Sequence, residues 1–353
     1  LLAFLSGLFI LVMGQIVVHP LLKIMSTPDD VMPLATLYMR IYFLGMPFIM
    51  LYNFGSAILR SIGDTRRPLL CLTVSGIINV ILNLFFVVIC GMSVEGVAIA
   101  TVISNVVSSS LVILFLMKEK SYVRLYPKKL SINGRILGEI AGIGIPAGVQ
   151  GMVFSFSNVC IQGALNGFGS VVMAGNSAAI NFEYYTYYVL NAFGQTCTTF
   201  VSQNTGANNI KRCGAVVLRA ASMSFVLTAV ISAVFIAFDT TFISIFTTEP
   251  DVVQYGITRM HIVLSFQIFN CLIEVFSGAL RGMGHSALPA IMAIMGVCVF
   301  RLFYVFVIFS HFNTLEALFM IYPISWILTA TAIVVSFIII FRKKYRENMT
   351  VTA

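Results

Sequence analysis

Two acidic side chains are set deep inside long apolar stretches of the sequence. Glu183 precedes a run of tyrosines, and Glu274 lies within a second apolar stretch. If these stretches cross a membrane, an ionisable group inside them is energetically unfavourable and marks a functional site by default. Such an acid can carry a proton, or it can bind Na⁺ as a carboxylate. Glu183 and Glu274 are therefore the first candidates for ion or cation binding.

Glu183 is also placed to attract an organic cation. It lies about 18 Å into an apolar stretch that begins near residue 171, at 1.5 Å per helical residue. Tyr187 follows on the same helical face, and aromatic rings attract cations. Asn181 and Gln150 are the polar residues expected to complete this site. The alternative is a glutamate neutralised by tyrosine hydroxyls for packing.

Glu274 suggests a second polar site. Asn270 precedes it by one turn on the same helical face. The alternative is an acid that extends to the membrane interface or pairs within its own helix. Other polar residues in the apolar stretches are expected to bond between helices rather than bind a ligand. These are Asn79, Asn83, Asn158, Gln162, Asn176 and Gln195.

Four basic residues also lie in apolar stretches. Lys23 and Arg259 are expected to extend to the outer membrane interface, because a long side chain can keep its charged end in water. Arg40 and Arg301 lie deeper. Arg301 is either the counter-ion of a buried carboxylate or a rim residue that reaches outward.

The remaining reactive side chains form no set that would support catalysis. The seven cysteines are scattered, without a CxxC pair or a His/Cys cluster at metal-ligand spacing. An intramembrane enzyme would need a paired set, such as Ser and His or two aspartates, and none lies mid-membrane. We therefore expect neither an enzyme nor a metal or cofactor, with Na⁺ or H⁺ only as a coupling ion.

The elements that carry these residues are long apolar helices. The chain is 59% hydrophobic and 10% charged, whereas soluble proteins carry about 25% charged residues. Its apolar runs are long enough to cross a hydrocarbon core of about 30 Å. We predict an all-α polytopic membrane protein. The ten expected spans are 1–25, 32–58, 69–91, 95–117, 137–166, 171–200, 213–237, 253–280, 288–310 and 315–341.

Charge is sorted between the loops that join these spans. The basic residues collect on alternate loops, chiefly the longest loop and the C-terminal tail, whereas the opposite loops carry mainly acids. Because basic loops stay on the cytoplasmic side, this pattern predicts a cytoplasmic C-terminus. The net charge of +8 thus reflects topology and contact with the lipid bilayer. Nucleic-acid binding is not expected.

One motif occurs twice. Leu-Arg-Ser-Ile-Gly-Asp-Thr-Arg-Arg-Pro at 59–68 recurs as Leu-Arg-Gly-Met-Gly-His-Ser-Ala-Leu-Pro at 280–289, an offset of 221 residues (280 − 59 = 221). Each copy should form a corner between two helices, with glycine at the turn and proline in the next first turn. The same offset sets Asn53 opposite Glu274, so the two halves differ in buried charge.

The repeat predicts how the helices are grouped. Two spans, 137–166 and 171–200, have no counterpart at this offset, so two helices are expected before Leu1. The whole protein would then have twelve helices in two six-helix (6+6) bundles, an arrangement found among secondary transporters. The predicted divisions are an N-terminal bundle at 1–117, a cytoplasmic linker at 118–136, a C-terminal bundle at 137–341 and a cytoplasmic tail at 342–353.

Several short motifs carry a family resemblance. They are Tyr-Met-Arg-Ile at 38–41, Val-Glu-Gly-Val-Ala-Ile-Ala-Thr at 94–101, Ile-Gly-Ile-Pro-Ala at 143–147, Ser-Gln-Asn-Thr-Gly-Ala at 202–207 and the repeated corner motif. Their order and spacing resemble the bacterial multidrug and toxic compound extrusion (MATE) transporters. The resemblance implies a V-shaped pair of six-helix bundles in the plasma membrane. It also implies export of small cationic or amphipathic molecules in exchange for Na⁺ or H⁺, which we expect from a monomer.

The sequence departs from this family at its coupling residues. One branch carries an Asp in the register of Asn270 and a Glu in the register of Phe154. Glu274 would then be a substitute displaced by one turn. The alternative function, also from the wider superfamily, is a flippase for a lipid-linked oligosaccharide or lipid. A flippase should hold several intramembrane basic residues, and only Arg40 and Arg301 are expected to lie deep, which favours cation export.

Overall fold

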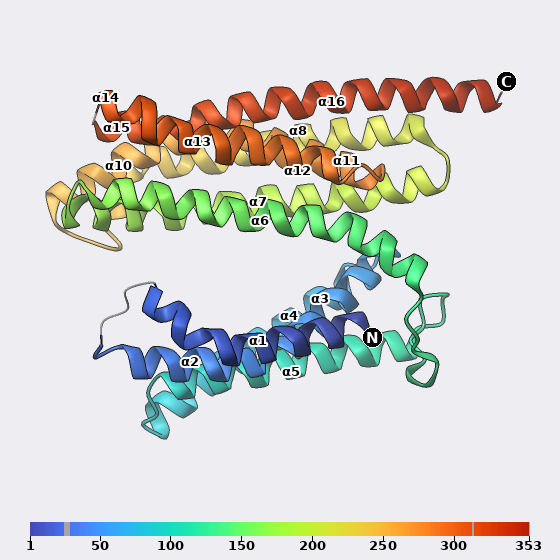
Figure 1. The fold of residues 1–353 in the computed structure, drawn as a ribbon, viewed down its shortest axis with the longest axis horizontal. Helices are drawn as coiled ribbons and strands as arrows, with labels where there is room; N and C mark the ends of the chain where they lie inside the picture. The colour runs from blue at the N-terminus through green and yellow to red at the C-terminus, as the bar shows by residue number, and fades with distance from the viewer. Residues whose placement is uncertain (25–28, 313, 353) are drawn as a thin grey trace. The chain divides into compact units, whose positions relative to one another are not determined.

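All regular secondary structure in the described part of the chain is helical. The computed structural model describes residues 1–24, 29–312 and 314–352 and contains no β-strand in these ranges (Figure 1). Contacts divide the chain into two compact units, Leu1–Ile136 and Leu137–Ala353.

The first unit packs its helices around a small apolar core. α5 lies against α2, α3 and α4, and α1 packs on α2 and α3. Leu59, Cys71, Val112 and Leu116 form the buried centre. The elements are α1 (Leu2–Ile24), α2 (Met32–Leu44), α3 (Met46–Ser61), α4 (Arg66–Leu84), the π-helical segment η1 (Phe85–Ile89), α5 (Val94–Lys118) and the 3₁₀ turn η2 (Pro127–Lys129).

The second unit is centred on α7, which contacts α8, α10 and α11. Its largest core cluster joins α7, α8, α11 and α16. The elements are α6 (Gly134–Asn166), α7 (Ser170–Gly206), α8 (Ile210–Ala237), α9 (Asp239–Ile243), α10 (Pro250–Ser265), α11 (Gln267–Gly282), α12 (Ala287–Ala293), η3 (Ile294–Val299), α13 (Phe300–Phe303), η4 (Tyr304–Phe309), α14 (Ser310–Phe312), α15 (Leu315–Phe319) and α16 (Ile321–Thr352). Both η3 and η4 are π-helical.

Most of these helices can cross a bilayer. Within the described ranges, 7 helices are long and apolar enough, or up to 9 if the bent pairs α2–α3 and α10–α11 each count as one span. α7, which corresponds to the predicted span 171–200, is 37 residues long but is not among them. The chain is therefore a multi-pass helical membrane protein. That it supplies ten of twelve spans, arranged in two six-helix bundles, stays a prediction.

The repeat in the sequence recurs in the backbone. The bent pairs break at Gly45 and Phe266, by 45° and 44°, at the same offset of 221 residues (266 − 45 = 221). Each corner motif turns at a glycine with positive φ, +86° at Gly63 and +87° at Gly284. In both corners this glycine donates its N–H to the carbonyl oxygen of the arginine three residues earlier, Arg60 at 2.9 Å and Arg281 at 3.0 Å. The two units thus share their corner geometry.

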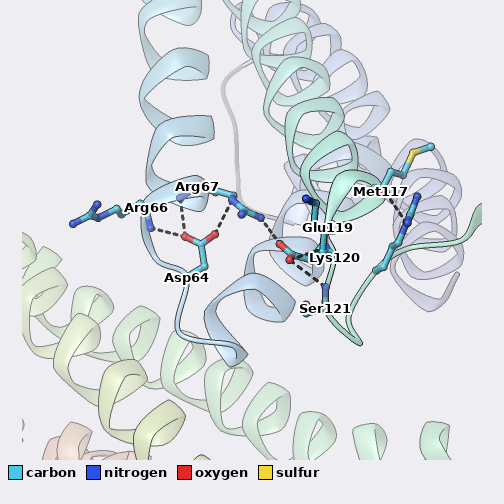
Figure 2. Close-up of polar contacts among 8 residues, drawn as sticks. Asp64, Arg66, Arg67, Met117, Glu119, Lys120 and Ser121 are labelled. Carbon is cyan, nitrogen blue, oxygen red and sulfur yellow. Dashed lines mark hydrogen bonds and ion pairs between the residues drawn. The ribbon is translucent and has the colours of Figure 1, made fainter.

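Polar contacts tie the start of the linker to the first corner (Figure 2). Asp64 accepts hydrogen bonds from the N–H groups of Arg66 and Arg67 and pairs with the Arg67 side chain at 3.0 Å. Arg67 also pairs with Glu119, which accepts a hydrogen bond from the Lys120 N–H. The Arg67 guanidinium and the backbone N–H hold the pKa of Glu119 below its usual range. Because the Arg67 side chain is 42% exposed, these contacts orient the linker more than they stabilise the fold.

Replacing Gly63 or Gly284 by Ala should strain its corner without causing a clash. A Cβ at either position meets no atom within 4 Å, so the loss of stability comes from the positive φ alone and should be about 1 kcal/mol. The measurement is thermal unfolding in detergent. Gly76→Ala is the matched control, because a Cβ also meets open space there and Ala favours the interior of α4. Corner variants that unfold at the parent temperature would contradict this prediction.

Candidate functional site

Glu183 on α7 forms a buried ion pair with Arg259 on α10. Arg259 Nε and Nη2 donate to the two carboxylate oxygens of Glu183 at 2.5 and 2.8 Å. Its Nη1 donates to Asn176 Oδ1 at 2.8 Å. Asn176 and Glu183 are two turns apart on α7, so both face α10. The side chain of Arg259 is only 2% exposed and that of Glu183 is 14% exposed.

Glycines let the two helices approach closely enough for this pair. A Cβ at Gly175 would lie 2.5 Å from the carbonyl oxygen of Val252, and a Cβ at Gly256 would lie 3.2 Å from the carbonyl oxygen of Gly175. Only glycine therefore fits at Gly175. The close approach brings the Arg259 side chain across to α7, where both carboxylate oxygens are within its reach.

The expectation that Arg259 extends to the outer interface is wrong. The guanidinium stays buried because a carboxylate and an amide on the neighbouring helix satisfy it there. The alternative role for Glu183, neutralisation by tyrosine hydroxyls, is wrong for the same reason: the partner is Arg259. In this state an organic cation would have to displace a guanidinium, although the role of Glu183 in cation binding stays a prediction.

Arg301 lies close to this pair, on α13. It is 3% exposed, so of the two alternatives for Arg301 the rim residue reaching outward is wrong. Its Nε donates to Ser325 Oγ at 3.0 Å and its Nη1 to Asn158 Oδ1 at 3.4 Å. The Tyr322 ring lies under both arginines, 4.5 Å from Arg301 Cζ and 4.9 Å from Arg259 Cζ. We call Asn176, Glu183, Arg259, Arg301 and Tyr322 the arginine cluster.

Glu274 has a different environment. It lies on α11 against the backbone of α7, where a Cβ at Gly194 would be 3.3 Å from Glu274 Oε2. Among the residues that the structure describes, no basic side chain forms an ion pair with it. The basic group that acts on it electrostatically is Arg281, two turns further along the same helix. Tyr187, predicted beside Glu183, instead lies where it interacts electrostatically with Glu274.

Gln267 is a functional candidate that the sequence did not single out. It begins α11 directly after the bend and is 2% exposed. Its Nε2 donates to Thr186 Oγ1 at 3.1 Å, whereas its buried Oε1 has no hydrogen-bond partner. The spacing of Gln267, Asn270 and Glu274 is i, i+3, i+7, which places all three on one face of α11. That spacing was a signal available in the sequence.

The other predicted site residues are not brought together. Asn181 hydrogen-bonds to its own helix, at Ser177 O. Gln150 is half-buried on α6, and Asn53 is exposed on α3 of the first unit. Asn176 and Asn158 do bond between helices, as expected for polar residues in spans. Their partners are the two buried arginines.

Removing one member of the Glu183–Arg259 pair should destabilise the fold. Glu183→Gln or Arg259→Gln leaves an unpaired buried charge or an unmatched amide, and each should lower the free energy of unfolding by about 3 kcal/mol. The double variant should lose less than the sum of the two, by at least about 1 kcal/mol. Denaturant titration in detergent measures all three.

The control for this cycle is Glu249→Gln, because Glu249 is an exposed acid outside the cluster. It should change the free energy of unfolding by no more than about 0.5 kcal/mol. Additive losses in the double variant would mean that the two side chains do not stabilise each other.

Comparison with known proteins places this helical framework in a family. The sequence profile of the MatE family matches residues 1–85 and 146–307. The probable multidrug resistance protein YoeA of Bacillus subtilis (strain 168) is 26% identical over 299 residues, 82% of this chain and 64% of that protein. A protein named FAD transporter, from Shewanella oneidensis, is 26% identical over 247 residues, 69% of this chain and 55% of that protein.

The fold agrees with this match. The crystal structure of MATE in the bent conformation has a TM-score of 0.90 with this chain at 20% sequence identity, and the match covers 99% of this chain and 78% of that one. The chain spans less than two-thirds of the length of the two curated relatives. These findings confirm the resemblance inferred from the motifs: the chain belongs to the MatE family of transporters.

Proposed function

We propose that the chain acts in a secondary antiporter that exports cationic or amphipathic organic molecules in exchange for H⁺ or Na⁺. Family membership and the apolar helices support transport rather than catalysis. In this proposal the chain supplies ten spans of a twelve-helix monomer in the plasma membrane, with a cytoplasmic C-terminus.

The observation that carries the proposal is the contrast between the two membrane acids. Arg259 already neutralises Glu183, and this ion pair disfavours the exchange of a proton or a cation at Glu183. Glu274 has no ion-pair partner among the described residues, and its carboxylate lies against α7 near Gly194. Glu274 is half-buried inside an apolar helix, and an acid without a counter-ion in such a place is most stable when it is protonated or holds a cation. Glu274 is therefore our candidate for the coupling acid.

The surroundings of Glu274 suit either coupling ion. Asn270 is one turn from Glu274 on the same face of α11, whereas Gln267, whose buried Oε1 has no partner, is two turns away, about 10 Å along the helix axis. Amide and carboxylate oxygens are the ligands that a hard cation such as Na⁺ takes. A protonated Glu274 would instead need only an acceptor for its hydroxyl. Tyr187 is the aromatic side chain that interacts with this acid.

Close packing can link the charge of Glu274 to helix movement. A Cβ at Gly278 would lie 2.3 Å from the Gly194 carbonyl oxygen, so α7 and α11 touch through their backbones. A neutral Glu274 is compatible with this close contact. An ionised Glu274 would need water or a cation at the same place, which favours separation of the two helices. Exchange of the ion would then shift the packing of α7 on α11.

The other functional assignments stay predictions. Asn181, Gln150 and Asn53 are candidates for substrate contact. A flippase for a lipid-linked oligosaccharide remains the alternative, and no relative reported above bears such a name. The relatives' names include both multidrug resistance and FAD transport, so family membership leaves the charge of the substrate open.

Glu274→Gln should abolish coupling. The amide keeps the shape of the side chain but can neither release a proton nor bind Na⁺ as a carboxylate, so gradient-driven efflux should fall at least about tenfold. The measurement is dye efflux from proteoliposomes under a proton gradient and, separately, a Na⁺ gradient. The gradient that drives the parent protein identifies the ion.

Glu316→Gln is the control for this test, because Glu316 is an exposed acid at the start of α15. It should transport as the parent does. Full gradient-driven efflux by Glu274→Gln would remove Glu274 from the coupling mechanism.

A further inference from the structure

Arg301 is a buried cation whose partners are all neutral. It is 3% exposed, and its hydrogen bonds go to Ser325 and Asn158. Its Nη2 has no hydrogen-bond partner among the described residues, although a guanidinium has five N–H donors. Removing a charge from water without an opposite charge is strongly unfavourable. Arg259 has an anionic partner in Glu183, whereas Arg301 has none among the described residues.

The neighbouring acid, Glu183, hydrogen-bonds to Arg259 and not to Arg301 among the described residues. Glu183 gives both of its oxygens to Arg259, so the arginine cluster holds two guanidinium groups and one carboxylate. The positive charge in excess is centred on Arg301. The Tyr322 ring, 4.5 Å from Arg301 Cζ, helps to fix the plane of the guanidinium but does not neutralise it.

The backbone around Arg301 is unusual. The four-residue α13 that carries it lies between the π-helical segments η3 and η4. π-Helical turns are rare and occur frequently at functional sites. Ser325 binds Nε, which leaves the edge formed by Nη1 and Nη2 for a second partner. That edge is the planar fork that matches a carboxylate or a phosphate.

The Nη1 atom of this guanidinium edge hydrogen-bonds to an exposed side chain, Asn158. Asn158 on α6 is exposed, and its 3.4 Å bond to Nη1 is long. The adjacent Ser157 has a buried hydroxyl without a partner. Ser157 lies on the same face of α6 as Ile161, which packs in the cluster that includes Tyr304. The link between α6 and α13 is thus the Asn158–Arg301 hydrogen bond, and the unpartnered Ser157 hydroxyl is the residue next to it in sequence.

We propose that Arg301 binds the carboxylate or phosphate group of an amphipathic substrate, which enters beside Asn158. The inference rests on the proposed transport function and narrows its substrate class. Substrates would include organic anions and zwitterions, and would not be limited to cations. Glu274 and Arg301 then have separate tasks, one for the coupling ion and one for the acidic group of the substrate.

A matched pair of dyes tests this site. One is a rhodamine with a free carboxylate, and the other is its methyl ester, which keeps the cationic ring system but lacks the acid. Fluorescence polarisation with the purified protein in uncharged detergent gives both affinities. The parent protein should bind the free acid more tightly than the ester, by about tenfold.

Asn158→Asp is the main variant, because it places a carboxylate against Arg301 without removing a buried group. It should weaken binding of the free acid by at least about tenfold and leave the ester within about twofold. Asn158→Ala should retain binding of the free acid, which shows that the added charge causes the loss. Arg301→Lys, which lacks the planar fork, should also weaken the free acid selectively. Arg219→Gln, an exposed arginine on α8, should change neither affinity.

Three results would overturn the proposal. The first is equal affinity of the parent protein for both dyes. The second is an equal loss of affinity for both dyes in Asn158→Asp. The third is that only phosphatidylglycerol binding depends on Arg301, which would assign the guanidinium to a lipid headgroup. Failure of the transport function is distinguishable: neither dye would be transported by the parent, while the free acid would still bind through Arg301.

Discussion

The second unit is organised by the high free energy of a charge that has left water. Arg259 and Glu183 meet this constraint together, because two short hydrogen bonds join them across α7 and α10. Glu274 and Arg301 do not have such a partner in the described structure. The pair joins two helices; for the other two charges we propose that Glu274 exchanges the coupling ion and that Arg301 binds an anion.

The backbone makes these contacts available. Glycines bring α7 and α10 together beside Asn176, and α7 and α11 together beside Glu274. The corners and bends that aim the helices occur in both units, with Gly63 and Gly284 in nearly the same conformation. The repeat therefore sets a common frame, and buried side chains distinguish the second unit from the first. Asn53, at the position equivalent to Glu274, carries no charge.

Sequence reasoning succeeded where a feature depends on local chemistry. The corner glycines, the apolar helices and the family follow from motifs and composition. It failed for Arg259, because helical spacing does not reveal which neighbouring helix a side chain faces. The partner Glu183 is 76 residues away in the chain, and the close contact at Gly175 that brings them together is a tertiary property. Gln267 was not singled out although its spacing from Asn270 and Glu274 was visible; its burial after the bend is a tertiary property.

The central claim is that Glu183 is structural and Glu274 carries coupling. The most direct test is gradient-driven efflux by the double variant Glu183→Gln/Arg259→Gln in proteoliposomes, normalised to the amount of folded protein. Because both charges are removed together, the account predicts that the double variant still couples efflux to the ion gradient that drives the parent. Efflux that no longer responds to that gradient would show that Glu183 takes part in coupling, and would contradict the account.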